Sequence, residues 1–290
     1  MRSSPDPHIA AALDDDAIAA LMEPLTALVV EAGAAVLAVR RGALDVAHKT
    51  DGSPVTAADL AADRIIVAGL ARIAPSIAAI SEERITGCEP ATADPVFLVD
   101  PLDGTKEFVA GRDEFTVNIA LVAGGTPVLG VVGAPALGLL WRGQVGRGAE
   151  RIAYQPIAAP TTGADAENLV RTVTAIRTRP WPGAGAPWVA AVSRSHQDQR
   201  SDAFIAARPG ARRRVLGSAI KLCRVADGEV DIYPRLSPTS EWDIAAGHAV
   251  VVAAGGIVTD GAGRPLRYGT SRPGFVLPEM IAWGDPAAMR

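Results

Sequence analysis

Apolar residues recur at every third or fourth position in two stretches near the start of the chain. The first stretch runs from residue 17 to residue 40 and is followed by Arg41 and Gly42, and the second runs from Thr56 to Pro75. This spacing is typical of helices that bury one face, and glycine or proline commonly ends a helix. The pattern therefore predicts two helices ahead of the first strands.

Short apolar runs bounded by turn residues follow these helices. The runs at 77–80 and 96–99 lead directly into carboxylates, whereas the runs at 115–122, 128–132 and 137–141 are typical of an antiparallel meander. The first half of the chain is therefore predicted to form an α+β structure around a sheet.

The second half has a different organisation. From residue 189 to residue 258, strand-like and helix-like segments alternate, which predicts a layered α/β domain. Residues 149–187, between the two halves, are rich in Pro, Gly, Ala and Thr, as is typical of a domain boundary. We therefore expect two closely associated domains, residues 1–155 with an α+β fold and residues 156–290 with an α/β fold.

The composition excludes several classes of protein. Of the 290 residues, 49% are apolar and 21% are charged, which is typical of a chain with a packed core rather than a disordered one. The 28 Lys and Arg nearly balance the 32 Asp and Glu, so a net charge of −4 argues against binding to a nucleic acid polymer. The net charge by itself selects no other partner.

The cysteines and the apolar segments indicate a compartment. Cys88 and Cys223 are far apart and fit neither a disulfide framework nor a zinc motif, which favours a reducing cytoplasm. Residues 1–16 contain four aspartates and no apolar run that could serve as a signal peptide. Because the longest apolar stretches, such as residues 245–256, fall short of the roughly 20 residues that span a bilayer, we expect no integral membrane segment.

Candidate chemistry lies in carboxylates at the ends of predicted strands and helices. Asp100 and Asp103 flank a turn after one strand, Glu82 follows the preceding strand, and Asp243 lies in the first turn of a helix. Four converging carboxylates would repel one another without cations, and Mg²⁺ prefers oxygen ligands. The carbonyl oxygen of Leu102, at the same turn, could supply a further ligand. Convergence of these groups would therefore indicate a magnesium site.

Each acid also has a structural interpretation. An Asp before Pro is common in turns, Glu82 could form a solvated pair with Glu83, and Asp243 is favoured by the helix dipole. Asp59 follows Thr56 by three residues, which is the spacing of a capping box. The metal-site interpretation therefore depends on the combination of acids and not on any one of them.

Motifs for several other chemistries are absent from the sequence. It contains no GxxxxGK[ST], no GxGxxG that opens a helix after a strand, no HExxH and no GxSxG. The four histidines, at positions 8, 48, 196 and 248, are dispersed. We expect His248 to be satisfied within a helix rather than to bind metal, which leaves oxygen-only ligation.

Four segments occur in the order and approximate spacing of a known family. They are DGSPVTAAD at 51–59, SEE at 81–83, DPLDGTKEF at 100–108 and WDIAAGHA at 242–249. From about residue 25 to residue 270, the chain resembles the inositol monophosphatase superfamily of Mg²⁺-dependent, lithium-sensitive phosphatases. Residues 1 to about 20 have no counterpart in this resemblance, and we expect them to form a mobile extension.

Further segments point to one branch of that superfamily. KEF at 106–108, SRSH at 193–196, Gly217-Ser218 with Lys221, and YPR at 233–235 are similar to the CysQ type, the bacterial 3'(2'),5'-bisphosphate nucleotidases. The resemblance implies a layered αβαβα sandwich of the inositol monophosphatase, or sugar phosphatase, type. The first domain would carry most metal ligands, and the second would complete the metal site and bind the nucleotide.

The resemblance also assigns roles to individual residues. Catalytic roles fall to Asp59, Glu82 and Thr105, of which Asp59 and Thr105 would orient the attacking water. The ligands of two or three Mg²⁺ ions would be Glu82, Asp100, Leu102, Asp103 and Asp243. The residues expected to bind substrate are Asp103, Gly104, Thr105, Lys106, His196, Ser218, Lys221, Arg235 and Asp243. Among these, His196, Ser218, Lys221 and Arg235 would contact the adenosine and its remaining 5'-phosphate.

The implied reaction is removal of the 3'-phosphate from adenosine 3',5'-bisphosphate by metal-activated water, which gives AMP and phosphate. The sulfated analogue would be a further substrate, and the reaction would clear a by-product of sulfate assimilation. The enzyme is expected in the cytoplasm, as a monomer or homodimer, and a peripheral position on the cytoplasmic face of the inner membrane is left open.

Two alternatives remain at this point. One is a phosphatase of the same superfamily that acts on inositol phosphates or sugar bisphosphates. The other is a non-catalytic module that binds metal or nucleotide. The complete set of acids argues against the second alternative, since binding alone requires neither Asp59 nor Thr105.

Overall fold

The computed structural model describes residues 13–42, 46–48, 54–85, 94–157, 170–183, 185–196, 198–269 and 273–289. The α-helices in these ranges are α1 (Asp15–Ala20), α2 (Met22–Arg40), α3 (Ala57–Ile73), α4 (Thr105–Val109), α6 (Gln199–Ala206), α7 (Ile220–Ala226) and α8 (Glu241–Ala253). Short 3-10 helices are formed by Glu82–Arg84, Pro135–Leu137, Pro273–Phe275 and Pro286–Met289. Cys88 lies outside the described residues, and Cys223 is a buried free thiol.

The first predicted helix is divided in two. It begins two residues earlier than expected and is interrupted at Leu21, which separates α1 from α2. The Asp14 side chain caps α1 by accepting a hydrogen bond from the Ala17 N–H at 2.7 Å. Residues 15–20 are therefore helical, although they were expected to belong to a mobile extension. The second helix, α3, begins directly after Thr56, as predicted.

The α1–α2 segment is both long and apolar. By length and composition alone, Asp15–Arg40 could cross a membrane, with a hydropathy of 1.6. However, 61% of its apolar window is buried in the protein, and α2 packs against α3 and the strands above it. The core helix of a soluble protein has the same composition, so the stretch is only weak support for a membrane span. The sequence analysis considered only uninterrupted apolar runs as membrane segments. It did not single out residues 15–40 because Glu23 and Glu31 interrupt the apolar residues there.

A seven-stranded sheet follows the helices, with the order β3-β4-β5-β6-β7-β8-β9. Its first pair is parallel and all others are antiparallel, so the predicted meander is present. The strands are β3 (Ala78–Ser81), β4 (Val96–Asp103), β5 (Thr116–Ala123), β6 (Thr126–Ala134), β7 (Leu139–Gln144), β8 (Gly148–Tyr154) and β9 (Arg171–Ile176).

Strand β9 lies beyond the boundary predicted at residue 155, yet it pairs with β8 and extends the first sheet. Residues 172–175 of this edge strand are exposed, so the strand lacks the apolar run by which the others were recognised. The large sheet therefore includes a segment that was assigned to the second domain.

The second half forms a smaller sheet with the order β11-β10-β12-β16-β14. Its strands are β10 (Trp188–Ser193), β11 (Ala211–Leu216), β12 (Ile232–Arg235), β14 (Ile257–Thr259) and β16 (Met280–Trp283). Two further pairs of short strands are β1 (Val46–His48) with β2 (Pro54–Thr56), and β13 (Thr239–Ser240) with β15 (Val276–Leu277).

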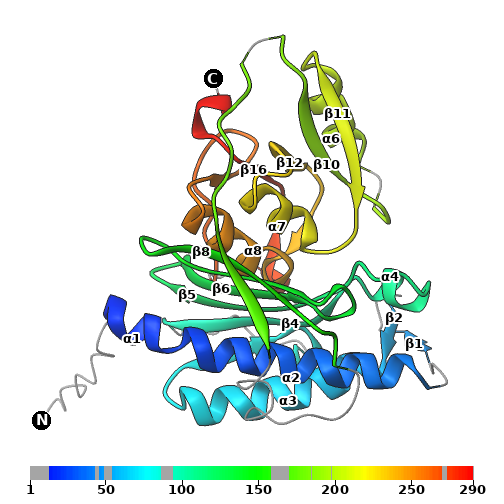
Figure 1. The fold of residues 1–290 in the computed structure, drawn as a ribbon, viewed down its shortest axis with the longest axis vertical. Coiled ribbons are helices and arrows are strands. Elements are labelled where there is room, and N and C mark those ends of the chain that lie inside the picture. Colours follow the sequence, from blue (N-terminus) through cyan, green and yellow to red (C-terminus); the bar gives the residue numbers. More distant parts are fainter. Residues whose placement is uncertain are drawn as a thin grey trace, which may run out of the picture.

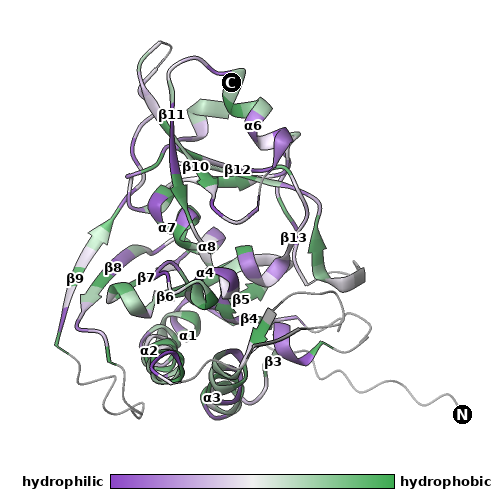
Figure 2. Cartoon of the chain, turned by 90° about the vertical axis from the view of Figure 1, so that its right-hand side faces the viewer, coloured by the Kyte–Doolittle hydropathy of each residue, from purple (hydrophilic) through white to green (hydrophobic). Residues whose placement is uncertain are grey.

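These elements stack as alternating layers of helices and sheets (Figure 1). α2 and α3 cover one face of the large sheet, and Figure 2 shows them end-on and side by side beneath it. α7 and α8 lie between the two sheets, and α6 packs on the outer face of the smaller one. The predicted layered αβαβα sandwich is confirmed.

Strand β4 shows how the large sheet positions a site between the layers. Phe97 and Val99 pack in the same cluster as α2 and α3, whereas Val96 and Leu98 pack with α7 and α8. Successive side chains of a strand point to opposite faces, and burial of both faces accounts for the continuous apolar run. Asp100 continues the series of Val96 and Leu98, so its carboxylate is directed toward α8.

Candidate active site

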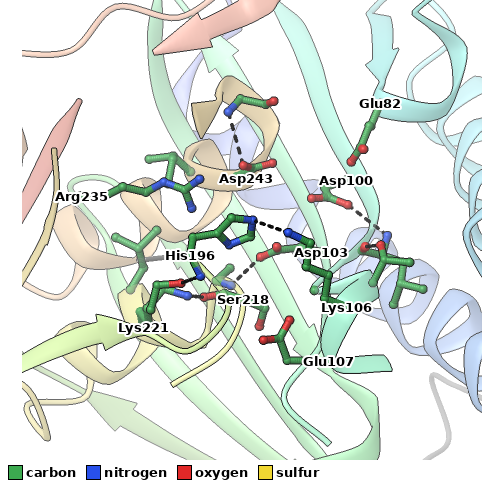
Figure 3. Close-up of a pocket in the computed structure, with 18 of the residues that line it drawn as sticks. Glu82, Asp100, Asp103, Lys106, Glu107, His196, Ser218, Lys221, Arg235 and Asp243 are labelled. Carbon is green, nitrogen blue, oxygen red and sulfur yellow. Dashed lines mark hydrogen bonds between the residues drawn. The ribbon is translucent and has the colours of Figure 1, made fainter. Parts of the chain in front are cut away.

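A pocket of about 270 Å³ lies where the end of β4 and helix α4 meet the first turns of α7 and α8 (Figure 3). Every residue that the sequence suggested for the site, except Asp59, lines this pocket. These residues are Glu82, Asp100, Leu102, Asp103, Gly104, Thr105, Lys106, His196, Ser218, Lys221, Arg235 and Asp243. The structure thus brings together residues from both halves of the chain.

One end of the pocket is acidic. Carboxylate oxygens of Glu82, Asp100 and Asp243 all lie within 4.8 Å of one another. The three residues come from different elements: the 3-10 helix after β3, strand β4 and the first turn of α8. Asp100 is almost completely buried, and burial together with the charges of Glu82, Asp103 and Asp243 raises its pKa well above the usual value. Such a group of oxygens fits a hard divalent cation, which would remove the repulsion.

Asp103 lines the same pocket but is held apart from these three acids. Its Oδ2 accepts a hydrogen bond from the Ala219 N–H at 2.5 Å, which draws the carboxylate toward the start of α7. Burial and the charge of Asp243 raise the pKa of Asp103 to about 7, although Lys221 and Arg235 act in the opposite direction. Of the four acids expected to bind metal, three therefore form the group, and Asp103 lies beside it.

The acids in the first turns of α3 and α8 also cap these helices. In α8, Asp243 Oδ2 accepts hydrogen bonds from Thr239 Oγ1 at 2.6 Å and from the Ser240 N–H at 3.3 Å. In α3, Asp59 Oδ2 accepts from the N–H and from the hydroxyl of Thr56, both at 2.7 Å. The predicted capping box is therefore present at Asp59, and Asp243, for which only the helix dipole was considered, forms a capping box as well. These hydrogen bonds fix where the second oxygen of each carboxylate points.

The second oxygen of Asp59 reaches the pocket through Thr105. Thr105 Oγ1 lies 3.3 Å from Asp59 Oδ1 and 3.2 Å from the carbonyl oxygen of Leu102, so its single proton can be donated to either. Burial raises the pKa of Asp59. An aspartate and a threonine joined in this way, beside a group of acids, can orient a water molecule.

The opposite end of the pocket is basic. It is formed by Lys106, His196, Lys221 and Arg235 (Figure 3). Lys221 is buried and donates to the carbonyl oxygen of Ser218 at 2.6 Å, and Lys106 Nζ lies 3.3 Å from His196 Nε2. Burial and the neighbouring cations Arg235, Lys106 and Lys221 lower the pKa of His196. Cations collected at one end of a pocket indicate a bound anion.

Two of these groups keep unused hydrogen-bonding capacity toward a ligand. The Arg235 guanidinium donates from Nη2 to the carbonyl oxygen of Pro238 at 3.3 Å, but its buried Nε has no hydrogen-bond partner among the residues that the structure describes. Lys221 Nζ has further protons beyond the one given to Ser218, and it lies 5.4 Å from the centre of the Tyr233 ring. A phosphate oxygen would satisfy such donors.

The backbone is constrained where the two ends meet. Gly104, directly before α4, has φ +91°, and Ser218 adopts φ +47°, which is uncommon for a residue with a side chain. A Cβ atom on Gly104 would lie 3.3 Å from the Ser218 Cβ and 3.2 Å from the carbonyl oxygen of Glu114. The turn after Asp103 therefore packs directly against the start of α7, and only glycine fits there without strain.

Sequence reasoning missed several contacts of the pocket. Glu107, Ser193, Tyr233 and Ser240 also line it. The signal for Glu107 was present, since it belongs to the KEF segment, but its contact lies far away in the sequence. His248 agrees with its prediction: it is buried, its Nδ1 lies 2.8 Å from the hydroxyl oxygen of Tyr268, and burial lowers its pKa to about 3.

Comparison with known proteins gives a consistent answer. The inositol monophosphatase family model matches residues 19–280. The 3'(2'),5'-bisphosphate nucleotidase CysQ of Shigella flexneri is 39% identical over 89% of this chain and 97% of its own length. CysQ of Escherichia coli (strain K12) is 38% identical over the same shares.

Solved structures agree. The crystal structure of CysQ from Bacteroides thetaiotaomicron superimposes with a TM-score of 0.70 at 34% identity, and the alignment covers 90% of this chain and 95% of that one. The IMPase from Thermotoga maritima gives a TM-score of 0.68 at 29% identity, with 89% of each chain covered. The chain therefore belongs to the inositol monophosphatase family.

Proposed function

We propose that this protein is a metal-dependent 3'(2'),5'-bisphosphate nucleotidase, which removes the 3'-phosphate of adenosine 3',5'-bisphosphate to give AMP and phosphate. The observation that carries the proposal is the division of one pocket into an acidic end and a basic end. A substrate with two phosphates matches this division, since one can be cleaved at the acidic end while the other is held by cations. The CysQ relatives, at 38–39% identity, support the same reaction.

Mg²⁺ is the proposed cofactor, with two or three ions per site. Glu82, Asp100 and Asp243 would hold it, and Asp103 and the carbonyl oxygen of Leu102 would supply further oxygens. When bound, Mg²⁺ supplies a Lewis acid that lowers the pKa of water and neutralises phosphate charge. The acids fit such an ion because burial, together with the charges of the neighbouring acids, already raises the pKa of Asp100.

The chain's own residues position the reactants. Asp59 and Thr105 orient the attacking water through their shared hydrogen bond, and Glu82 supports it from the acidic end. The backbone at Gly104 and Thr105 contacts the phosphate to be cleaved. The proposed partners of the retained 5'-phosphate and the adenosine are Lys106, His196, Ser218, Lys221 and Arg235. Holding the phosphate and the water in line in this way is the main contribution of the protein to phosphoryl transfer.

A sugar bisphosphate also carries two phosphates, whereas an inositol monophosphate carries one and would leave the basic end of the pocket without a partner. The sulfated analogue, adenosine 3'-phosphate 5'-phosphosulfate, presents an anion at the same place and is a second expected substrate. The two phosphates alone do not separate a nucleotide from a sugar bisphosphate, and the CysQ relatives favour the nucleotide as the proposed substrate. We place the enzyme in the cytoplasm, and no feature of the described residues supports a peripheral membrane position.

The proposal is tested by kcat/KM with Mg²⁺ on adenosine 3',5'-bisphosphate, inositol 1-phosphate and fructose 1,6-bisphosphate. We expect the nucleotide to be preferred over inositol 1-phosphate by at least about a hundredfold, because losing charged hydrogen bonds to one phosphate changes binding by a factor of this order. Fructose 1,6-bisphosphate keeps a second phosphate but lacks the adenosine, so it should also be a poorer substrate than the nucleotide. Asp103→Asn serves as the control for the site and should lose most activity on all three. A preference for either of the other two substrates would reject the nucleotidase assignment.

A further inference from the structure

Two glutamates of the first half of the chain accept hydrogen bonds from the second half. Glu107 lies on α4 and Glu114 lies in the turn before β5. Neither belongs to the acidic group formed by Glu82, Asp100 and Asp243. Both are directed instead at the segments that carry the cations of the basic end.

Glu107 holds the segment after β10. Its side chain is almost fully buried, and Oε1 accepts a short hydrogen bond from the hydroxyl of Ser195. Ser195 directly precedes His196, and Lys106, directly before Glu107, has its Nζ 3.3 Å from His196 Nε2. The Glu107–Ser195 hydrogen bond therefore fixes His196 relative to α4, the helix that also carries Lys106.

Glu114 holds the same segment and also the start of α7. Its Oε2 accepts hydrogen bonds from Arg194 Nη2 at 2.8 Å and from the Gly217 N–H at 3.0 Å. A Cβ atom on Gly217 would lie 3.0 Å from the Glu107 Cγ and 2.7 Å from the carbonyl oxygen of Glu114, so the three residues are closely packed. Ser218 follows directly, and Lys221 donates to its carbonyl oxygen.

The segment that carries both glutamates, residues 105–114, also leads back to the acidic end, since α4 follows Asp103 after a single glycine. These hydrogen bonds, together with the one from the Ala219 N–H to Asp103, therefore contribute to the distance between the acidic and basic ends. We propose that Glu107 is a positioning residue that fixes the spacing between the two phosphate subsites, with Ser195 as its partner and Glu114 in support. This inference rests on the proposed function.

The test compares a substrate with two phosphates and one that lacks the 5'-phosphate. For Glu107→Ala, KM for adenosine 3',5'-bisphosphate should rise about tenfold or more, because a charged hydrogen bond that orders the binding segment is lost. For 3'-AMP, which keeps the adenosine but lacks the 5'-phosphate, KM should rise by a clearly smaller factor than for the bisphosphate, and kcat should stay within about twofold. Affinity for the product AMP, measured by calorimetry in the presence of Mg²⁺, should fall by the same factor as affinity for the bisphosphate.

Matched variants separate positioning from folding. Ser195→Ala removes the other half of the hydrogen bond at a less buried position and should reproduce the selective loss. Glu107→Gln keeps an oxygen that accepts from Ser195 and should restore most of the affinity. Glu31 lies on α2, which covers the other face of the large sheet. Glu31→Ala should therefore leave KM unchanged for both substrates.

The outcomes are distinguishable. If Glu107→Ala and Ser195→Ala raise KM equally for both substrates, the inference is wrong and the proposed function is unaffected. The same holds if Glu107→Gln raises KM for the bisphosphate as much as Glu107→Ala does. A wild-type enzyme that does not prefer the nucleotide in the substrate panel would overturn the proposed function and the inference with it.

Discussion

Asp100 combines burial with three acidic neighbours, which is unfavourable unless a cation is present. Its pKa is raised well above the usual value in the folded protein, so at neutral pH, where the carboxyl group of the unfolded chain is ionised, the folded state without metal is destabilised. The same residue accepts a hydrogen bond from the Leu102 N–H at 3.0 Å, a bond that an amide oxygen could also accept. The charge of Asp100 and its role in the turn can therefore be separated by one substitution.

We predict that Asp100→Asn raises the free energy of unfolding of the metal-free protein by about 1 kcal/mol or more, since one pKa unit corresponds to about 1.4 kcal/mol. Urea unfolding in EDTA measures this change. The variant should lose nearly all phosphatase activity and most of the stabilisation that Mg²⁺ gives to the wild type. A variant less stable than wild type in EDTA would show that the carboxylates do not repel one another as described.

His248 makes the fold sensitive to acid. Burial lowers its pKa to about 3 from an ordinary value of 6.5, so the unfolded chain takes up a proton in the interval between these values and the folded protein does not. The contribution of neutral His248 is therefore complete above pH 6.5 and decreases as the pH falls toward 3. At pH 5 the loss would be about 2 kcal/mol, at about 1.4 kcal/mol per pKa unit.

His248→Asn tests this dependence, because the asparagine amide takes approximately the position of Nδ1, which contacts the Tyr268 hydroxyl, and does not titrate. The free energy of unfolding of wild type should fall between pH 7.5 and pH 5 by about 2 kcal/mol more than that of the variant. Urea denaturation at the two pH values gives both numbers. Identical pH dependence in the two proteins would mean that His248 is not the group responsible.

At the scale of elements, the contact between α8 and strand β6 places Asp243 opposite Asp100. A Cβ atom on Gly130 of β6 would lie 2.2 Å from the carbonyl oxygen of Ala246 in α8, so helix and sheet approach as closely as a glycine permits. Ala246 is three residues beyond Asp243 in the same helix. Any displacement of α8 from the sheet therefore moves one acid of the group away from the others.

Gly130→Ala should lower the free energy of unfolding by about 1–3 kcal/mol, which is typical of overpacking a core. It should also lower kcat/KM by tenfold or more, because catalytic groups tolerate little displacement. Gly42→Ala is the matched control, since its Cβ would come no closer than 3.5 Å to the Val39 carbonyl oxygen. Thermal unfolding and steady-state kinetics of both variants measure these two effects. A Gly130→Ala enzyme with the kcat/KM of the wild type would contradict the placement of α8.

Elements with a strong local signal were predictable. α3 and α8 have periodic apolar residues and first-turn acids, and strands β4 to β7 have apolar runs separated by turns. By contrast, β16 was missed because it is recognised only through its distant partners β12 and β14, and β9 because it is an exposed edge strand. The break between α1 and α2 at Leu21 was not predicted, because position 21 itself holds neither glycine nor proline.

At the scale of the whole molecule, the order of motifs was sufficient to collect the site residues, but the sequence did not indicate how they divide within the pocket. Asp103 lies beside the acidic group because the Ala219 N–H, 116 residues away in sequence, binds its carboxylate. Glu107 likewise contacts Ser195 across 88 residues. Such contacts depend on how the two halves pack, which local patterns do not encode.

The division of the pocket into acidic and basic ends predicts which phosphate ester is cleaved and therefore which product is formed. Adenosine 3',5'-bisphosphate should be bound with its 3'-phosphate at Glu82, Asp100 and Asp243 and its 5'-phosphate at Lys221 and Arg235. Phosphorus NMR of the reaction mixture with Mg²⁺ identifies which ester is cleaved. We predict 5'-AMP and inorganic phosphate in equal amounts; formation of 3'-AMP, or no hydrolysis of the bisphosphate at all, would contradict the proposed function.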